Sequence, residues 1–151
     1  VLNASPARAL PKEALKVVDY LIVNEIEAQQ LATGLGIPKE SPVEIARKLA
    51  DIGSLCCIIT LEEKGSIAAF EGSTFIQPAL LVEAVDTTGA GDAFCGMFAA
   101  CLQSGHSWLA ALHRASIGAS LSCLGLGAQA GIPFMEDIEA SLVKVPPPQK
   151  I

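Results

Sequence analysis

Apolar residues occur along this chain in short runs whose patterns predict particular elements. Tyr20–Val23 and Cys56–Leu61 are continuously apolar, which is typical of strands buried on both faces of a parallel sheet. Two further strand-like runs, Gly65–Phe70 and Ser73–Gln77, flank the turn residues Glu71-Gly72 and predict a β-hairpin. The chain is therefore expected to contain a mostly parallel sheet with a hairpin.

Helices are predicted between and after these strands. Ser41 and Glu44 are spaced as in a capping box before one helix, and Pro11 lies near the first turn of another. The predicted helices span residues 10–18, 25–32 (ending at Gly34), 42–51, 90–103, 107–124 and 135–143. This alternation predicts an α/β fold, with residues 1–145 in one domain and the Pro-rich residues 146–151 as a flexible tail.

Composition narrows the class of partner and the compartment. A hydrophobic content of 51% with 17% charged residues predicts a packed core, and 5% aromatic residues leave few platforms for stacking bases. A net charge of −6 argues against nucleic acid and anionic membranes as partners. The odd count of five cysteines, none in a C-x-x-C pair, favours buried thiols in a reducing cytoplasm over a disulfide framework. The sequence contains no signal peptide and no apolar run long enough to span a membrane.

The segment 85–99, VDTTGAGDAFCGMFA, carries the most specific chemistry of the chain. It passes from an apolar strand through a Gly loop into a helix that is expected to begin near Ala90. Gly89 and Gly91 allow backbone amides to crowd together, and the start of a helix adds unpaired donors, so the turn predicts an anion site. Asp92 lies beside that site, where a carboxylate can take a proton from an attacking hydroxyl. The residues alone also permit a purely structural turn in which Thr87 or Thr88 caps the helix.

DTTGAGD resembles the second signature of the ribokinase (PfkB) family of sugar kinases. Four more segments resemble family motifs in the family's order: VLNASPA at 1–7, Asn24-Glu25-Ile26-Glu27, TLEEKG at 60–65, and Gly127-Ala128-Gln129 followed by Pro133. The resemblance extends from residue 1 to about residue 142. It implies a ribokinase-like three-layer α/β/α fold that is truncated at the N-terminus, where family members carry the sugar pocket and lid.

The resemblance implies an ATP-dependent kinase that phosphorylates a primary hydroxyl, with D-ribose converted to ribose 5-phosphate. Fructokinase and nucleoside kinase are alternatives, against which LNASPA and GAQ favour ribose. Asp92 would be the general base, Gly89, Ala90 and Gly91 the anion hole, and Asp86 and Asp92 would contact the sugar. The implied nucleotide-binding residues are Asn24, Glu27, Thr60, Leu61, Glu62, Glu63, Lys64, Gly65, Gly91, Asp92 and Ser116.

The resemblance also implies two ions. Mg²⁺ would accompany ATP, with Glu27 acting through metal-bound water, which suits the preference of Mg²⁺ for oxygen ligands. The implied ligands of a monovalent cation, K⁺, are Asp86, Thr88, Ser122, Gly125, Gly127 and Gly131. Gly131 stands where the family has Ser, so one hydroxyl ligand is lost. These residues taken alone favour Asn24 as an N-cap, with Glu25 or Glu27 as ordinary first-turn acids, whereas beside DTTGAGD the functional role is favoured.

Two departures from the family pattern leave other functions open. Glu62 replaces a Gly in the nucleotide loop and adds negative charge near the phosphates, and Ser116 replaces an Asn at the adenine site. The alternatives are a non-catalytic nucleotide-binding fragment or pseudokinase, and an interaction module that needs another chain. The expected partners are ATP and a small sugar, with a homodimer only where the missing N-terminal half is present. His106 and His113 are expected to be structural, and Trp108 to be a core or interface anchor.

Overall fold

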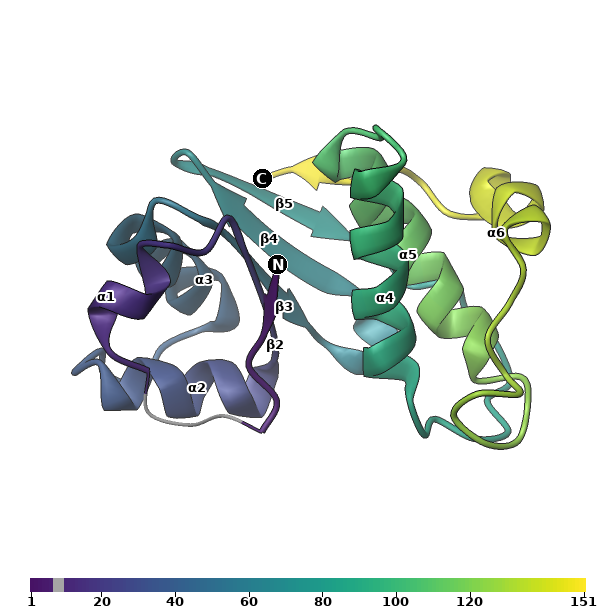
Figure 1. The fold of residues 1–151 in the computed structure, drawn as a ribbon, viewed down its shortest axis with the longest axis horizontal. Helices are drawn as coiled ribbons and strands as arrows, with labels where there is room; N and C mark the ends of the chain where they lie inside the picture. Colours follow the sequence, from purple (N-terminus) through teal and green to yellow (C-terminus); the bar gives the residue numbers. More distant parts are fainter. Residues whose placement is uncertain (7–9) are drawn as a thin grey trace. The chain divides into compact units, whose positions relative to one another are not determined.

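Figure 1 shows a computed structural model of the chain, which describes residues 1–6 and 10–151. Ala7, the last residue of the VLNASPA segment, lies outside the described residues. The chain forms two compact units. The first unit comprises Val1–Leu61, Ser66–Ile76 and Lys150–Ile151, and the second comprises Glu62–Gly65 and Gln77–Gln149.

A mixed sheet gives the first unit its framework. Its strands are β1 (Leu2–Asn3), β2 (Tyr20–Asn24), β3 (Cys56–Thr60), β4 (Ser66–Phe70), β5 (Ser73–Gln77) and β6 (Gln149–Lys150), in that spatial order. β1, β2 and β3 are parallel, and β4 is antiparallel to β3. The apolar runs and the hairpin that the sequence predicted are thereby confirmed as β2, β3, β4 and β5.

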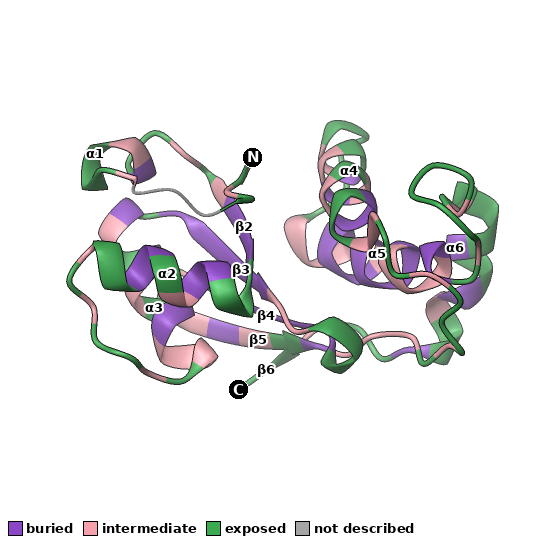
Figure 2. Ribbon diagram, turned by 90° about the horizontal axis from the view of Figure 1, so that it is seen from below, coloured by how far each residue is buried: buried purple, intermediate pink, exposed green. Residues whose placement is uncertain are grey.

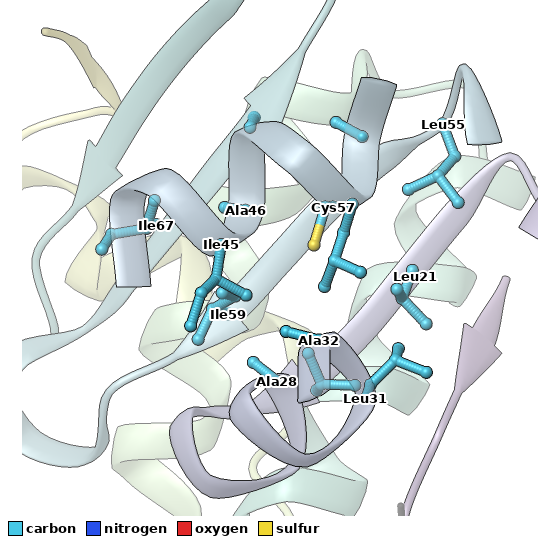
Figure 3. Packing of buried hydrophobic residues seen from close by; sticks show 14 of the residues in the cluster. Leu21, Ala28, Leu31, Ala32, Ile45, Ala46, Leu55, Cys57, Ile59 and Ile67 are labelled. Atoms are coloured by element: carbon cyan, nitrogen blue, oxygen red, sulfur yellow. The ribbon is translucent and has the colours of Figure 1, made fainter. Parts of the chain in front are cut away.

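Three helices belong to the first unit: α1 (Lys12–Leu15), α2 (Glu25–Gly34) and α3 (Pro42–Gly53). The core contains alternate strand residues, among them Leu21, Cys57 and Ile59, together with Leu31 and Ile45 from the helices (Figure 3). Alternation by two is the side-chain period of a strand, so one face of β2 and β3 lies against α2 and α3. This packing fixes the carboxyl ends of β2 and β3, where the predicted Asn24 and Thr60 lie.

The second unit is helical, with α4 (Ala90–Gln103), α5 (Trp108–Ser122) and α6 (Met135–Ser141). Eight of the fifteen residues of α5 are buried (Figure 2). Gly118 lets α5 lie close to α4, because a Cβ there would be 3.2 Å from Met97 Cε. Ser107 caps α5 by accepting a hydrogen bond from the Ala110 amide at 3.3 Å. The N-terminal end of α4 thus belongs to a closely packed pair of helices.

The first helix is shorter than the sequence predicted. α1 spans Lys12–Leu15 and not residues 10–18. Pro11 has an extended backbone (φ −66°, ψ 150°), and Val17 is 84% exposed. Leu15 is the one residue of α1 that is buried, so burial favours a single turn and no more.

The C-terminal segment contains a strand that the sequence did not indicate. Gln149–Lys150 forms β6, and the Ile151 amide donates to the Thr74 carbonyl oxygen at 2.9 Å. The three prolines of residues 146–148 precede the strand, where their missing amides remove no ladder bond. A short edge strand of two exposed residues has too little pattern to be recognised from sequence.

Candidate active site

The turn into α4, where the sequence predicted an anion site, is formed by a glycine in the left-handed region. Gly89 is the N-cap of α4 with φ +81°, and its carbonyl accepts the Ala93 amide at 2.8 Å as the first helical bond. A Cβ at Gly89 would be 2.6 Å from Ala128 Cβ, so this position excludes any side chain. Gly91 is exposed, and no atom would lie within 4 Å of a Cβ there. The first amides of a helix have no acceptor within the helix, so those of Gly91 and Asp92 face outward.

Asp92 is the third residue of α4 and is exposed. Its carboxylate therefore lies in the first helical turn, where the partial positive charge of the helix N-terminus favours an anion. No ion pair of the described residues involves Asp92, because the three such pairs are Arg47–Glu44, Lys48–Glu40 and Arg114–Glu139. The carboxylate is thus accessible from solvent.

Asp86 ties this turn to the loop that follows α5. Its Oδ1 accepts the Thr88 amide at 2.9 Å, and its Oδ2 accepts the Gly127 amide at 2.9 Å. Hydrogen bonds from the Thr88 side chain, the Thr88 amide and the Gly127 amide hold the pKa of Asp86 below its usual value. The amides of Val85 and Asp86 both donate to the Cys123 carbonyl, at 2.8 and 3.2 Å. These hydrogen bonds therefore hold the segment before Gly89 against the loop after α5.

The loop after α5 is tightly packed around Gly131. The Gly131 amide donates to the Gly127 carbonyl at 3.3 Å. A Cβ on Gly131 would be 2.4 Å from the Ser122 carbonyl oxygen, and a Cβ on Gly125 would be 2.9 Å from Gly131 Cα. The predicted cation residues Asp86, Ser122, Gly125, Gly127 and Gly131 are thus brought together.

In the first unit, Asn24 and Glu27 form a reciprocal capping box at the start of α2. Asn24 Oδ1 accepts the Glu27 amide at 2.8 Å, and Glu27 Oε2 accepts the Asn24 amide at 3.0 Å. Glu27 is 8% exposed, whereas Asn24 is exposed and pairs across the sheet with Thr60. The capping interpretation of this motif is confirmed. Across residues 1–6 and 10–151, no group of three or more His, Cys, Asp or Glu side chains could hold a metal by itself.

The TLEEKG loop contains a non-Gly residue in the left-handed region. Glu62 has φ +54° and begins a 3₁₀ turn over Glu62–Lys64. The Gly65 amide donates to the Glu62 carbonyl at 3.1 Å, and a Cβ on Gly65 would be 2.0 Å from the Gln77 carbonyl oxygen. Gly65 is therefore required by space, and it closes the turn that places Glu62 in this conformation.

Ser116, predicted at the adenine site, is 4% exposed in α5. Its hydroxyl donates to the Pro78 carbonyl at 3.2 Å. The Ser116 hydroxyl thus already has an acceptor within the protein, and this hydrogen bond joins α5 to the segment after β5.

The candidate residues divide between the two units. Asn24, Glu27, Thr60 and Leu61 lie in the first unit, and the remaining candidates lie in the second. Sequence reasoning missed three groups that contact the segment 85–89. They are the Cys123 carbonyl, Ala128 beside Gly89, and the Gly127 amide, which donates to Asp86. The Gly-rich run GLGAQAG signals a turn but cannot show which of its backbone groups faces Asp86.

Both histidines fit structural positions. His113 is buried in α5, with Nε2 3.0 Å from the Val145 carbonyl oxygen, and burial lowers its pKa. His106 is exposed in the turn between α4 and α5. None of the helices in the described parts of the chain has the length and apolarity needed to cross a membrane.

The chain is thus an α/β protein with a left-handed glycine at the N-terminus of α4 and an exposed carboxylate in the first turn of that helix. The chain belongs to the pfkB family of carbohydrate kinases, whose model matches residues 1–135. It is 36% identical to the ribokinase of Staphylococcus aureus over 140 residues, covering 91% of this chain and 46% of that protein. It is 35% identical to the deoxyribokinase of Salmonella typhi over 144 residues, covering 94% and 47%.

Solved structures confirm the predicted ribokinase-like fold. The chain is similar to the ribokinase from Thermotoga maritima with a TM-score of 0.86 at 33% identity, covering 94% of this chain and 48% of that one. It is also similar to the Arabidopsis thaliana ribokinase complexed with ribose and ATP, with a TM-score of 0.78 at 30% identity, covering 90% and 44%. The chain thus spans about half the length of the relatives that it matches.

Proposed function

We propose that this chain supplies the nucleotide-binding and phosphoryl-transfer part of an ATP-dependent sugar kinase that converts D-ribose to ribose 5-phosphate. Similarity to ribokinases, one of them complexed with ribose and ATP, supports the reaction class and the substrates. The observation that carries the proposal is the left-handed Gly89 turn with Asp92 in the helical turn that follows. A deoxyribose substrate is the nearest variant, since a deoxyribokinase is among the relatives.

In the proposed reaction, Asp92 accepts the proton of the sugar's primary hydroxyl. The hydroxyl oxygen forms a bond to the γ-phosphorus of ATP, and the bond from that phosphorus to the bridging oxygen breaks, releasing ADP. The amides around Gly89, Ala90 and Gly91 stabilise the negative charge that spreads over the transferring group. In this reaction Asp92 and Gly91 must be accessible to the sugar and to ATP, and both residues are exposed.

Asp86 is proposed to position this turn and to contact the sugar. Its carboxylate receives the Thr88 and Gly127 amides, so it holds the residues just before Gly89 against the loop after α5. The carboxylate is ionised at neutral pH, and its charge strengthens both hydrogen bonds, which in turn hold its pKa below the usual value. Thr60–Gly65 and Ser116 are proposed to border the nucleotide.

Mg²⁺ is proposed to accompany ATP, with Glu27 acting through metal-bound water. The Asn24 amide holds one carboxylate oxygen of Glu27 and so fixes the orientation of the group, which fits that role. When bound, Mg²⁺ supplies positive charge that offsets the charge of the phosphates. The residues implied for K⁺ do not form a complete ligand set, because Gly131 offers no hydroxyl and its amide already donates to the Gly127 carbonyl. No step is assigned to K⁺.

A non-catalytic nucleotide-binding protein is the second candidate. Glu62 favours it, because an exposed carboxylate in the nucleotide loop opposes the negative phosphates. For either candidate a cytoplasmic location is proposed, since all five thiols are free.

Calorimetric titration with Mg·ATP tests the anion site. Gly89→Ala and Gly105→Ala each place a side chain at positive φ (81° and 85°), but only the first would lie 2.6 Å from another Cβ. We expect Gly89→Ala to abolish binding and Gly105→Ala to retain it. Equal binding by both variants would remove the Gly89 turn from the nucleotide site.

Ribose-dependent ADP release then separates the two candidates. We expect wild type to release ADP, and Asp92→Asn to bind Mg·ATP with unchanged affinity but to lose turnover by a factor of about 100 or more. Turnover that survives in Asp92→Asn would exclude Asp92 as the base. Nucleotide binding without any ribose-dependent turnover in wild type would favour the second candidate.

A further inference from the structure

The loop that joins α5 to α6 closes on itself around Gly131. The Gly131 amide donates to the Gly127 carbonyl, which is one of the backbone oxygens that a cation in this loop would need. The Ser122 carbonyl oxygen lies against Gly131, at 2.4 Å from the position where a Cβ would be. Two of the candidate oxygens are therefore already in contact with the backbone of one glycine.

Two other candidate groups, the Asp86 carboxylate and the Ser122 hydroxyl, also have partners within the protein. Asp86 receives one amide on each carboxylate oxygen, from Thr88 and from Gly127. The Ser122 hydroxyl donates to the Ala119 carbonyl at 2.8 Å and so turns back into α5. Gly131 has no side chain to offer, and the close approach of the Ser122 carbonyl oxygen leaves no room for one. These groups are thus held by contacts within the protein, and the loop lacks the hydroxyl that the resemblance places at residue 131.

We propose that Gly131 replaces the monovalent cation in this loop, so that the loop and the anion turn beside it form without K⁺. The contacts of Gly131 hold residues 122, 125 and 127 together. Asp86 accepts the Gly127 amide and so connects this loop to the segment before Gly89. The part of the inference that concerns nucleotide binding rests on the proposed function. The part that concerns the loop does not, because it depends only on contacts within the protein.

Thermal unfolding of the chain in different chloride salts tests the loop without any ligand. We expect equal Tm values in K⁺, Na⁺ and N-methylglucammonium at the same ionic strength. Thallium(I) NMR provides a direct probe, since Tl⁺ resembles K⁺ in size and charge, and we expect no K⁺-sensitive broadening of its signal. A saturable rise in Tm with K⁺ alone, or Tl⁺ broadening that K⁺ reverses, would overturn the proposal.

Gly131→Ala tests whether the glycine itself closes the loop. Its Cβ must push away the Ser122 carbonyl, so we expect a Tm several degrees below wild type in all three salts. Gly96→Ala is the matched control in the same unit, because Gly96 lies on exposed helix surface with nothing within 4 Å of a Cβ. Its Tm is expected to equal or exceed that of wild type. A Gly131→Ala variant as stable as wild type would show that Gly131 does not hold the loop.

These outcomes are distinguishable from failure of the proposed function. The unfolding and thallium measurements contain no nucleotide, so they give the same result whether or not the chain binds ATP. Mg·ATP titration in K⁺ and in N-methylglucammonium extends the test to the anion turn, and we expect equal affinities. K⁺-dependent affinity would overturn the inference while leaving the proposed kinase function intact.

Discussion

At the scale of single residues, Glu62 combines backbone strain with unfavourable charge. A left-handed backbone costs a residue with a side chain about 1 kcal/mol, and Glu62 has φ +54°. Gly65 maintains this conformation, because its amide bonds to the Glu62 carbonyl and the space beside it admits no side chain. The loop therefore keeps its shape even though the residue at its start is poorly suited to that shape.

Glu62→Gly is expected to raise both stability and nucleotide affinity. Removing the strain should add up to about 1 kcal/mol to the free energy of unfolding, partly offset by the greater freedom of glycine in the unfolded chain. Two charges about 4 Å apart repel by about 1 kcal/mol even in water, so removing the carboxylate should tighten Mg·ATP binding by about fivefold when it lies at that distance from a phosphate. Denaturant unfolding and calorimetry measure the two effects.

Glu71→Gly is the matched control for this variant. Glu71 also has a positive φ, 47°, but it lies in the turn of the β4–β5 hairpin. We expect the same gain in stability and no change in Mg·ATP affinity. If Glu62→Gly fails to exceed Glu71→Gly in affinity, the carboxylate of Glu62 does not face the nucleotide.

At the scale of elements, side chains connect α5 to the segment that leads toward β6. His113 Nε2 is 3.0 Å from the Val145 carbonyl, and Gln77 Nε2 donates to the carbonyls of Pro78 and Pro146 at 2.8 and 3.2 Å. Ile138 and Val145 pack with Ile117 in a small apolar cluster. The C-terminal segment is thus ordered by contacts with α5 as well as by its own short strand.

His113 should make the stability of the chain depend on pH. Burial lowers its pKa below 6.5, so between its folded and unfolded pKa values the folded chain binds fewer protons than the unfolded chain. Its contribution is therefore fully present above about pH 6.5 and is lost as the pH falls through the lowered pKa. We expect Tm to fall on acidification from about pH 7.5 to 5, and His113→Gln to reduce that fall.

The exposed His106 provides the control for this titration. His106→Gln, in the turn between α4 and α5, should leave the pH dependence of Tm as in wild type. Arg114 and Glu139 also act on His113, and both remain in the variant. A His113→Gln profile parallel to that of wild type would assign the acid sensitivity to other groups.

Sequence reasoning was successful for elements whose signals are local. Ser41 caps α3 through the Glu44 amide, and the hairpin turns at Glu71-Gly72, as predicted. The link between Asp86 and Gly127 was not predicted, because it joins residues 41 positions apart. Nor does sequence indicate that Ala128 faces Gly89. The α4 turn was therefore predictable, whereas the loop that supports it was not.

At the scale of the whole molecule, each unit is held together by its own packing. The first unit is organised by an aliphatic core between the sheet and α2 and α3, and the second by the pairing of α4 with α5. The family and fold were predictable because motifs such as DTTGAGD carry them. The partition of the candidate residues between two units was not, because it depends on contacts that no motif encodes.

The reactivity of the buried cysteines can be used to measure unfolding of the whole molecule. Burial raises the pKa of Cys56 to about 12 and also raises the pKa of Cys57, so neither forms the reactive thiolate in the folded chain. Of the five free thiols, only Cys95 is partly exposed. We expect a disulfide reagent to label one thiol rapidly and four at the rate of unfolding, and Cys95→Ser to remove the rapid phase. More than one rapid thiol in wild type would indicate local opening of the core.

The contact between Gly89 and Ala128 has a consequence for how this sequence can change over time. A side chain at 89 meets the Cβ of residue 128, and Asp86 depends on the amide of the residue just before Ala128. A substitution in either segment therefore alters which residues the other segment can accept. We expect substitutions in the turn before α4 and in the loop after α5 to be correlated among related sequences.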